Sequence, residues 1–430
     1  MHGLASFVRR AVRLAGSLAV AACVGGTVAC SGKTGDPVLF APKPPDAGRV
    51  TELFDGGFAN ADGAALGCGC VVTTPVHSDK LDLLFVVDNS SSMQEEQSAL
   101  RREFPRMITK LITGDHDNDG KPDHQPIVDL HLAVVSSDMG ASTDVCTALG
   151  DDGRFRHEPN PAGDAALSCK KSYPTFLKYE GGLPPMAQLA QDFSCVAALG
   201  TQGCGFEHHL ESALKALWPA SDPSLQFVGL GGASSLGRGD TDNAGFLRAH
   251  VQNAATLAIV VVADEDDCSS YDRNIFRFQA TSDANDPLAD RPVNLRCFDY
   301  ADRLQPLERY VYGFRHLGSA RVVFAAIVGV PVDLVDPSAR KAVDFRNRAV
   351  RDAYYDEILS DPRMQQKLDP NDDTDLAPAC RSKLGRASPA RRFVSLAKRF
   401  GEDSLIQSIC DADFGPPVDL IVEHVTVPVE

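Results

Sequence analysis

Four short, almost purely apolar runs recur along the chain, and they limit the folds that it can adopt. They span residues 81–87, 128–135, 257–263 and 321–328, and a shorter run follows at 405–409. Runs of this length and composition predict strands buried on both faces, as in a parallel sheet. Apolar residues with helical spacing lie between or after the runs, at 93–111, 210–217, 304–314, 390–400 and 418–422. This alternation predicts the α/β class, with a doubly wound, mostly parallel, Rossmann-like sheet.

The N-terminus has the layout of a secretory signal followed by a lipid-attachment site. Three arginines precede an uncharged stretch at 14–29, and the chain then turns polar. The stretch is too short and too rich in small residues for a convincing membrane-spanning helix, which is the competing interpretation. Cys30 and Cys23 each follow small residues, as in the lipobox of bacterial lipoproteins. We predict that residues 1–30 are a signal peptide with a lipobox and that Cys30, or alternatively Cys23, carries lipid.

Twelve cysteines occur in the chain, and ten of them follow Cys30. All ten can pair if Cys30 is lipidated, whereas processing at Cys23 leaves an odd thiol in an oxidising compartment. Their spacing does not match a zinc site, which favours disulfides. Sequence neighbours are the simplest partners, although spacing alone does not fix the connectivity. The couples are Cys68 with Cys70, Cys146 with Cys169, Cys195 with Cys204, Cys268 with Cys297, and Cys380 with Cys410.

The chain divides into a tether and one large domain. Residues 31–78 are rich in proline and glycine, which predicts a flexible link between the lipid and the folded part. The domain is expected at 79–425. Stretches rich in Gly, Pro, Asp and Ser interrupt it at about 141–190, 220–242 and 333–388. We expect these to be long loop insertions stapled by disulfides.

The formal net charge of −16 restricts the class of partner. Nucleic acids and anionic lipid surfaces repel an acidic face, so neither is expected to be the main partner. Contact with the membrane is expected through the lipid anchor alone. Cations and basic patches on a partner are more compatible with this negative charge.

The first apolar run ends in the sequence Asp-Asn-Ser-Ser-Ser, which places Asp88, Ser90 and Ser92 at the carboxyl end of a buried strand. Ligands bind at that end of open α/β sheets. Hydroxyls and a carboxylate are small oxygen ligands of the kind that Mg²⁺ prefers, and they leave a coordination position free. Asp and Ser are also ordinary N-cap residues, so a serine-rich helix cap is the alternative.

An Asp-Xaa-Ser-Xaa-Ser motif between a strand and a helix resembles the metal-ion-dependent adhesion site of von Willebrand factor type A (VWA) domains, including those of bacterial lipoproteins. The resemblance covers roughly 79–425. The helix at 390–400, Gly401, and the strand and helix that follow are similar to the end of many VWA domains. The resemblance implies one Mg²⁺ or Mn²⁺ held by Asp88, Ser90 and Ser92, with a partner's carboxylate completing the shell.

The resemblance also implies ligands from two further loops. Asp264, after the third apolar run, takes the place of the family's distal aspartate, although Glu265 stands where the family usually has glycine. A solvated acidic turn is the alternative there. The family's threonine has no clear equivalent, because the Gly-Gly-Thr pattern is missing. Thr201 is the first candidate and Glu207 the second, although Glu207 at a helix start also suits the helix dipole.

Residues 115–123 read Asp-His-Asp-Asn-Asp-Gly-Lys-Pro-Asp and resemble the calcium loops of EF-hands and thrombospondin type 3 repeats. Alternating carboxylates converge on one hard cation, the glycine permits a sharp turn, and a backbone carbonyl supplies a further ligand. Pro126 replaces the twelfth-position glutamate, which lowers the expected affinity for Ca²⁺. We predict a structural calcium staple, with a metal-free acidic turn as the alternative. The ligands would be Asp115, Asp117, Asp119, the Lys121 carbonyl and Asp123.

No catalytic constellation is evident in the sequence. Glu207, His208 and His209 lack metalloprotease spacing, so we interpret them as surface residues of a helix. No Gly-Xaa-Ser-Xaa-Gly elbow supports a serine hydrolase. We therefore expect a binding protein and not an enzyme, lipid-anchored in the cell envelope and facing the periplasm or the exterior. It would recognise a protein or peptide carboxylate in adhesion or envelope assembly. The alternatives are an envelope phosphoesterase with two cations on the acidic rim, or a structural VWA module without a functional metal site.

Overall fold

The computed structural model describes residues 28–31, 69–72, 78–140, 150–160, 168–228, 234–248, 255–276, 288, 291–319 and 321–426. The chain forms two compact units, 1–76 and 77–430. In the first unit, strands β1 (Val28–Ser31) and β2 (Gly69–Val72) pair antiparallel, with Cys30 opposite Cys70. Most of the predicted signal peptide and tether, with Cys23 and Cys68, lies outside the described residues.

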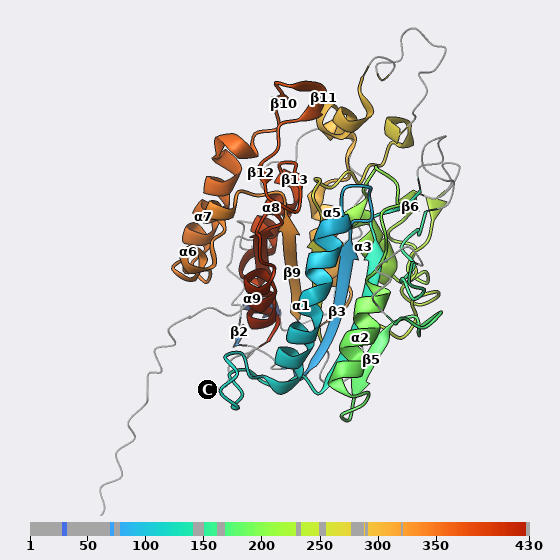
Figure 1. Ribbon diagram of the computed structural model, residues 1–430, viewed down its shortest axis with the longest axis vertical. Coiled ribbons are helices and arrows are strands. Elements are labelled where there is room, and N and C mark those ends of the chain that lie inside the picture. Colours follow the sequence, from blue (N-terminus) through green and yellow to red (C-terminus); the bar gives the residue numbers. More distant parts are fainter. Residues whose placement is uncertain are drawn as a thin grey trace, which may run out of the picture. The chain divides into compact units, whose positions relative to one another are not determined.

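The second unit is built on a six-stranded sheet (Figure 1). In spatial order the strands are β14 (Ser404–Ser408), β9 (Arg321–Val328), β8 (Thr256–Val262), β3 (Lys80–Val87), β4 (Asp129–Ser136) and β5 (Leu177–Glu180). All neighbours pair parallel except β4 with β5. The chain runs outward from β3 to β5, returns to β8 and runs outward to β14, so the strand order reverses between β3 and β8. This reversal is the switch point at which α/β sheets bind ligands.

Helices cover both faces of the sheet. One face packs against α1 (Gln94–Thr113), α2 (Met186–Val196) and α9 (Gly415–Val425). The other packs against α3 (His209–Leu217), α5 (Leu307–His316) and α8 (Arg391–Phe400). Successive side chains of β3 from Leu83 to Val87 alternate between the two cores, which explains why this part of its sequence is apolar without a break. The predicted α/β class and mostly parallel sheet are confirmed. No helix in the described ranges has the length and apolar character needed to cross a bilayer.

The predicted insertions contain more regular structure than their sequences indicate. The stretch at 333–388 holds helices α6 (Pro337–Lys341) and α7 (Arg348–Ser360) and two short hairpins. Helix α7 buries few side chains, chiefly Tyr355 and Ile358, and the Tyr355 hydroxyl lies 2.8 Å from the hydroxyl of Ser404. So small an apolar face leaves a weak helical pattern in the sequence. The stretch at 141–190 likewise contains β5 and the start of α2, so the prediction that these stretches are irregular was wrong.

Short elements complete the described part of the unit. The remaining strands and helix are β6 (Phe227–Val228), β7 (Ser234–Ser235), β10 (Leu368–Asp369), β11 (Asp372–Leu376), β12 (Cys380–Arg381), β13 (Arg386–Ala387) and α4 (Arg296–Asp299). Single 3₁₀ turns occur at Arg273–Phe276, Val293–Leu295, Ala301–Arg303, Val332–Leu334, Pro362–Met364 and Gly401–Asp403.

Three disulfides link described residues. Cys268–Cys297 and Cys380–Cys410 form as predicted. The third is Cys169–Cys195, so the predicted couples Cys146 with Cys169 and Cys195 with Cys204 were wrong. The segment after residue 168 lies along α2, where Lys170 pairs with Asp192 at 2.9 Å, and this brings the two cysteines together. Cys204 is also disulfide-bonded, and Cys146 lies outside the described residues.

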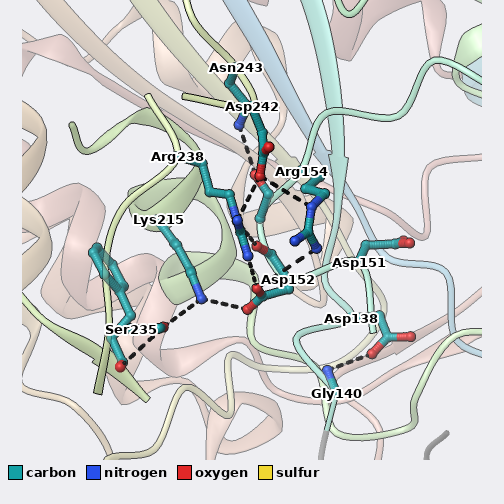
Figure 2. Close-up of polar contacts among 12 residues, drawn as sticks. Asp138, Gly140, Asp151, Asp152, Arg154, Lys215, Ser235, Arg238, Asp242 and Asn243 are labelled. Carbon is teal, nitrogen blue, oxygen red and sulfur yellow. Dashed lines mark hydrogen bonds and ion pairs between the residues drawn. The ribbon is translucent and has the colours of Figure 1, made fainter. Parts of the chain in front are cut away.

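A buried polar cluster fastens the 234–243 segment to α3 (Figure 2). The Lys215 side chain is fully buried, and its ammonium group donates to Asp152 at 2.5 Å and to the Ser235 hydroxyl at 2.7 Å. The Arg238 guanidinium contacts both Asp152 and Asp242. Asn243 donates to the carbonyls of Gly153 and Ala216. Asp152 therefore neutralises two cations that are largely removed from water.

Candidate functional site

Two aspartates end the two strands that flank the switch point. Asp88 follows β3 directly, and Asp264 lies just beyond the end of β8. The backbone NH of Asp88 donates to the Val262 carbonyl at 3.0 Å, which ties the two strand ends together. Asp88 is fully buried, and Asp264 is 5% exposed. Parallel pairing thus brings residues far apart in sequence to one edge of the sheet.

The serine loop after β3 folds back on Asp88. The Ser90 backbone NH donates to Asp88 Oδ1 at 2.7 Å, and the hydroxyls of Ser90 and Ser92 lie 3.3 Å apart. Gln97 on α1 donates to the Asp88 carbonyl at 2.8 Å. Helix α1 has Met93 as its N-cap residue, and no side chain among the described residues caps it. The serines therefore do not serve as the helix cap that the alternative interpretation required.

Buried carboxyl groups repel one another at the centre of the site. Burial, followed by the nearby charge of Asp88, raises the pKa of Asp264 to about 7, while a hydrogen bond with Ser92 acts in the opposite direction. Burial also raises the pKa of Glu96 to about 7, with Asp264 and Asp88 adding to the rise. One carboxylate oxygen of each of these three residues is buried without a hydrogen-bond partner. Carboxylates left in this state gain most from a cation placed among them.

Glu207 lies in this acidic region, and the loop that carries Thr201 lies beside Asp88, since Gln97 donates to the carbonyls of both Asp88 and Gly200. Glu207 is 2% exposed. Its pKa is raised well above the usual range by burial and then by the charges of Glu265, Asp88 and Asp264. Thr201 is partly exposed, and its loop contacts the serine loop through Gly203, whose NH donates to the Asn89 carbonyl at 2.8 Å.

Several residues beside Asp88 were missed or misplaced by the sequence analysis. His209 Nε2 lies 3.4 Å from Asp88 Oδ2, and the hydroxyl of Ser137 donates to Asp88 Oδ1 at 3.5 Å. Glu207, His208 and His209 are all buried, so the prediction that they lie on a helix surface was wrong. Their helix starts at the sheet edge, and a helix start at that position faces the site. Ser137 had a usable signal, since it follows the strand next to β3.

The donor set fits a small, hard cation. Carboxylates and hydroxyls are the ligands that Mg²⁺ and Mn²⁺ take in proteins. Asp88, Ser90, Ser92 and Asp264 supply both kinds of oxygen. The unpartnered oxygens of Asp88 and Asp264 are buried and chemically suited to coordinate an ion. The residues present therefore fit one divalent ion at the switch point.

The acidic loop after α1 gathers three of its four aspartates. Ligand oxygens of Asp115, Asp117 and Asp123 lie within 4.8 Å of one another, and one oxygen of Asp115 is buried without a hydrogen-bond partner. Asp119 instead accepts from the Lys121 NH at 2.8 Å. The left-handed backbone at Gly120, with φ of 88°, makes the sharp turn that the sequence predicts. These carboxylates suit Ca²⁺ as a structural ion.

We expect the stability of the metal-free protein to fall as pH rises from 5 to 8.5. Asp264, Glu96 and Glu265 have pKa values raised to about 7, 7 and 8 in the folded protein. In that window the folded state binds more protons than the unfolded state, so the free energy of unfolding decreases as pH rises. The loss should be on the order of 2 kcal/mol in urea unfolding with chelator present.

The matched control is Asp264→Asn, which removes one raised carboxylate and should flatten the pH profile. Excess Mg²⁺ should also restore stability at pH 8.5. A metal-free protein whose stability is equal or greater at pH 8.5, with the same profile in Asp264→Asn, would contradict the electrostatic description of the site.

Neither protein-family models nor curated proteins matched this chain when it was compared with them. The resemblance to VWA domains therefore stays a prediction from the sequence motif.

Proposed function

We propose that this chain is a VWA-like binding module that holds one Mg²⁺ or Mn²⁺ at the switch point and recognises a carboxylate of a protein or peptide partner. In this proposal Asp88, Ser90, Ser92 and Asp264 hold the ion, directly or through water. When bound, the ion supplies a Lewis-acidic position that a partner's carboxylate completes. The chain's own residues bind and orient, and none needs to act as a nucleophile.

One observation carries the proposal. Strands β3 and β8 are neighbours in the six-stranded sheet, and each is followed by a buried aspartate that has one oxygen without a hydrogen-bond partner. A stable core seldom retains buried carboxylate oxygens without a hydrogen-bond partner, and a cation would supply the missing contact. The serine hydroxyls beside Asp88 add neutral oxygen ligands, so an ion held here would keep enough positive charge to attract a partner's carboxylate.

The neighbouring side chains have supporting roles in this proposal. Ser137 and His209 contact Asp88 and would orient its carboxylate. Thr201 stays the first candidate for the third ligand, because its loop meets the serine loop at Gly203, whereas Glu207 lines the cavity beside the site. Ca²⁺ at residues 115–123 would brace α9, since His116 contacts Glu423 at 2.9 Å. We retain the lipid anchor and the cell-envelope location as parts of the proposal.

Carboxylate recognition can be tested with two immobilised peptide libraries. One contains Asp and Glu, and the other has Asn and Gln at the same positions. We expect retention on the acidic library with Mg²⁺, loss with chelator, and at least roughly tenfold weaker binding of Asp88→Ala, about 1.4 kcal/mol. Asp123→Ala, which alters only the calcium loop, is the control and should bind normally. Equal retention on both libraries, or binding that chelator does not change, would contradict the proposal.

A two-metal phosphoesterase is the second candidate. The proximity of Glu207 and Glu265 to Asp88 and Asp264 favours it, because two cations require paired carboxylate sites. Turnover of generic phosphomonoesters and phosphodiesters with Mg²⁺ or Mn²⁺, lost in Glu265→Gln, would support this alternative. Absence of turnover leaves the binding module as the better account.

A further inference from the structure

A cavity of about 230 Å³ opens beside the candidate metal site. Glu265, which immediately follows Asp264, lines it together with Glu207. The cavity is smaller than the roughly 300–1,000 Å³ typical of pockets for small-molecule ligands. It has room for one side chain and not for a large ligand.

Two glutamates of this cavity lie side by side. The two carboxyl groups lie close enough that, after burial, the charge of Glu265 is the next cause of the raised pKa of Glu207. Glu207 is 2% exposed, and among the described residues neither glutamate forms an ion pair with a Lys, Arg or His. The other acids of the lining differ, because Asp267 pairs with Arg392 at 3.1 Å, Asp375 pairs with Arg386, and Asp266 accepts from the Arg392 backbone NH at 3.0 Å. Glu207, which is buried, and Glu265, which is partly exposed, thus lack a cationic partner among the described residues.

The rest of the cavity lining includes apolar side chains, and a disulfide and an arginine fix its position. Its apolar lining includes Phe206, Phe298, Leu304 and Leu376. The Cys268–Cys297 disulfide ties the loop after β8 to the segment that carries Phe298. Arg392 adds a second tie, since it donates to Asp267 and to the Gln305 carbonyl at 2.9 Å. A preformed wall of this kind reduces the entropy that is lost on binding.

We propose that this cavity accepts the side chain of a lysine or arginine from the protein partner. The alkyl stem would lie against the aromatic and aliphatic wall, with the cationic group at Glu207 and Glu265. A bare divalent cation fits less well, because Ca²⁺ takes six to eight oxygens and Asp267 is already engaged by Arg392. The net charge of −16 also favours a basic partner.

This inference adds a second contact to the proposed function. It rests on the proposed function for the first contact, between the partner's carboxylate and the metal ion. The same partner segment would present an acidic residue to the ion and a basic residue to the cavity. Binding of the basic group alone does not require the metal, so the two ideas can fail separately.

The test measures binding of three blocked amino acids to the full chain by calorimetry in chelator. The probes are the N-acetyl methylamides of lysine, arginine and norleucine, of which norleucine is the neutral control. We expect lysine or arginine to bind at least tenfold more tightly than norleucine. Glu265→Gln and Glu207→Gln should each abolish this preference. Glu308→Gln, which alters an exposed acid on α5 outside the cavity, should leave it unchanged.

A second variant tests the cavity without altering its charge. Ala301 is exposed and lines the cavity, so Ala301→Trp should obstruct it and weaken binding of the basic probes about tenfold, while the Mg²⁺ response is kept. Equal binding of norleucine, or full binding by Glu265→Gln or Ala301→Trp, would overturn the inference. So would Ca²⁺ binding lost in Glu265→Gln with no binding of the basic probes, since that result identifies a metal site. Failure of the Mg²⁺ response alone would count against the proposed function and not against the cavity.

Discussion

Replacing Asp88 with alanine is expected to abolish the thermal stabilisation of the protein by Mg²⁺. In the wild type, saturation at about 100 times Kd should add about 2.7 kcal/mol, which raises Tm by roughly 4 °C in a domain of this size. Asp88 is fully buried and contacts the serine loop, His209 and Ser137, so no other residue can take its position. Differential scanning calorimetry with and without Mg²⁺ provides the measurement.

The calcium loop offers a matched control for this prediction. Asp123→Ala should keep the Mg²⁺ response and lose stabilisation by low concentrations of Ca²⁺, whereas Asp88→Ala should show the reverse. Without metal, Asp88→Ala should be no less stable than the wild type at pH 8, because Asp88 repels Asp264. An unchanged Mg²⁺ response in Asp88→Ala would remove the metal assignment at the switch point.

Asp152→Asn is expected to destabilise the folded protein by about 3–5 kcal/mol, the range for breaking a buried ion pair. Asp152 faces a fully buried Lys215 and a largely buried Arg238 (Figure 2). Asparagine preserves the size of the side chain and tolerates the left-handed backbone at this position, where φ is 53°. The effect therefore reports the lost charge and not backbone strain. Urea unfolding at pH 7.5 measures it.

Asp242→Asn is the control, because Asp242 also contacts Arg238 but its side chain is 42% exposed. An exposed pair contributes only about 0–1 kcal/mol, so this variant should unfold near the wild-type midpoint. Lys215→Met removes one of the two buried cations, and Asp152→Asn should then be less harmful in that background. A loss of less than about 1 kcal/mol in Asp152→Asn alone would show that the cluster is not a major source of stability.

The sequence predicts the central strands of the sheet well, and the edge strand and outer helices less well, for a physical reason. The strand β3 and its parallel neighbours are buried on both faces, so their sequences are almost purely apolar. The edge strand β5 buries chiefly Leu177, and α7 buries chiefly Tyr355 and Ile358. Elements that contribute so few core residues have little apolar pattern to detect.

The same reason explains which residues of the candidate site the sequence predicts and which it does not. Asp88 and Asp264 were identified because each follows a recognisable buried strand. His209 gave no such signal, because its burial depends on where α3 begins relative to the sheet edge. The Cys169–Cys195 bond depends on how one loop lies along α2, which neighbour spacing does not encode. Tertiary placement, and not local pattern, determines both.

The hydrogen bond from the Asp88 NH to the Val262 carbonyl has a consequence for how the protein responds to denaturation. It joins the two innermost strands, which are among the last elements of an α/β domain to open, whereas edge strands and loops fray first. A site anchored there does not loosen through local fluctuations. The site should therefore keep its geometry as the temperature rises and be lost only together with the native state.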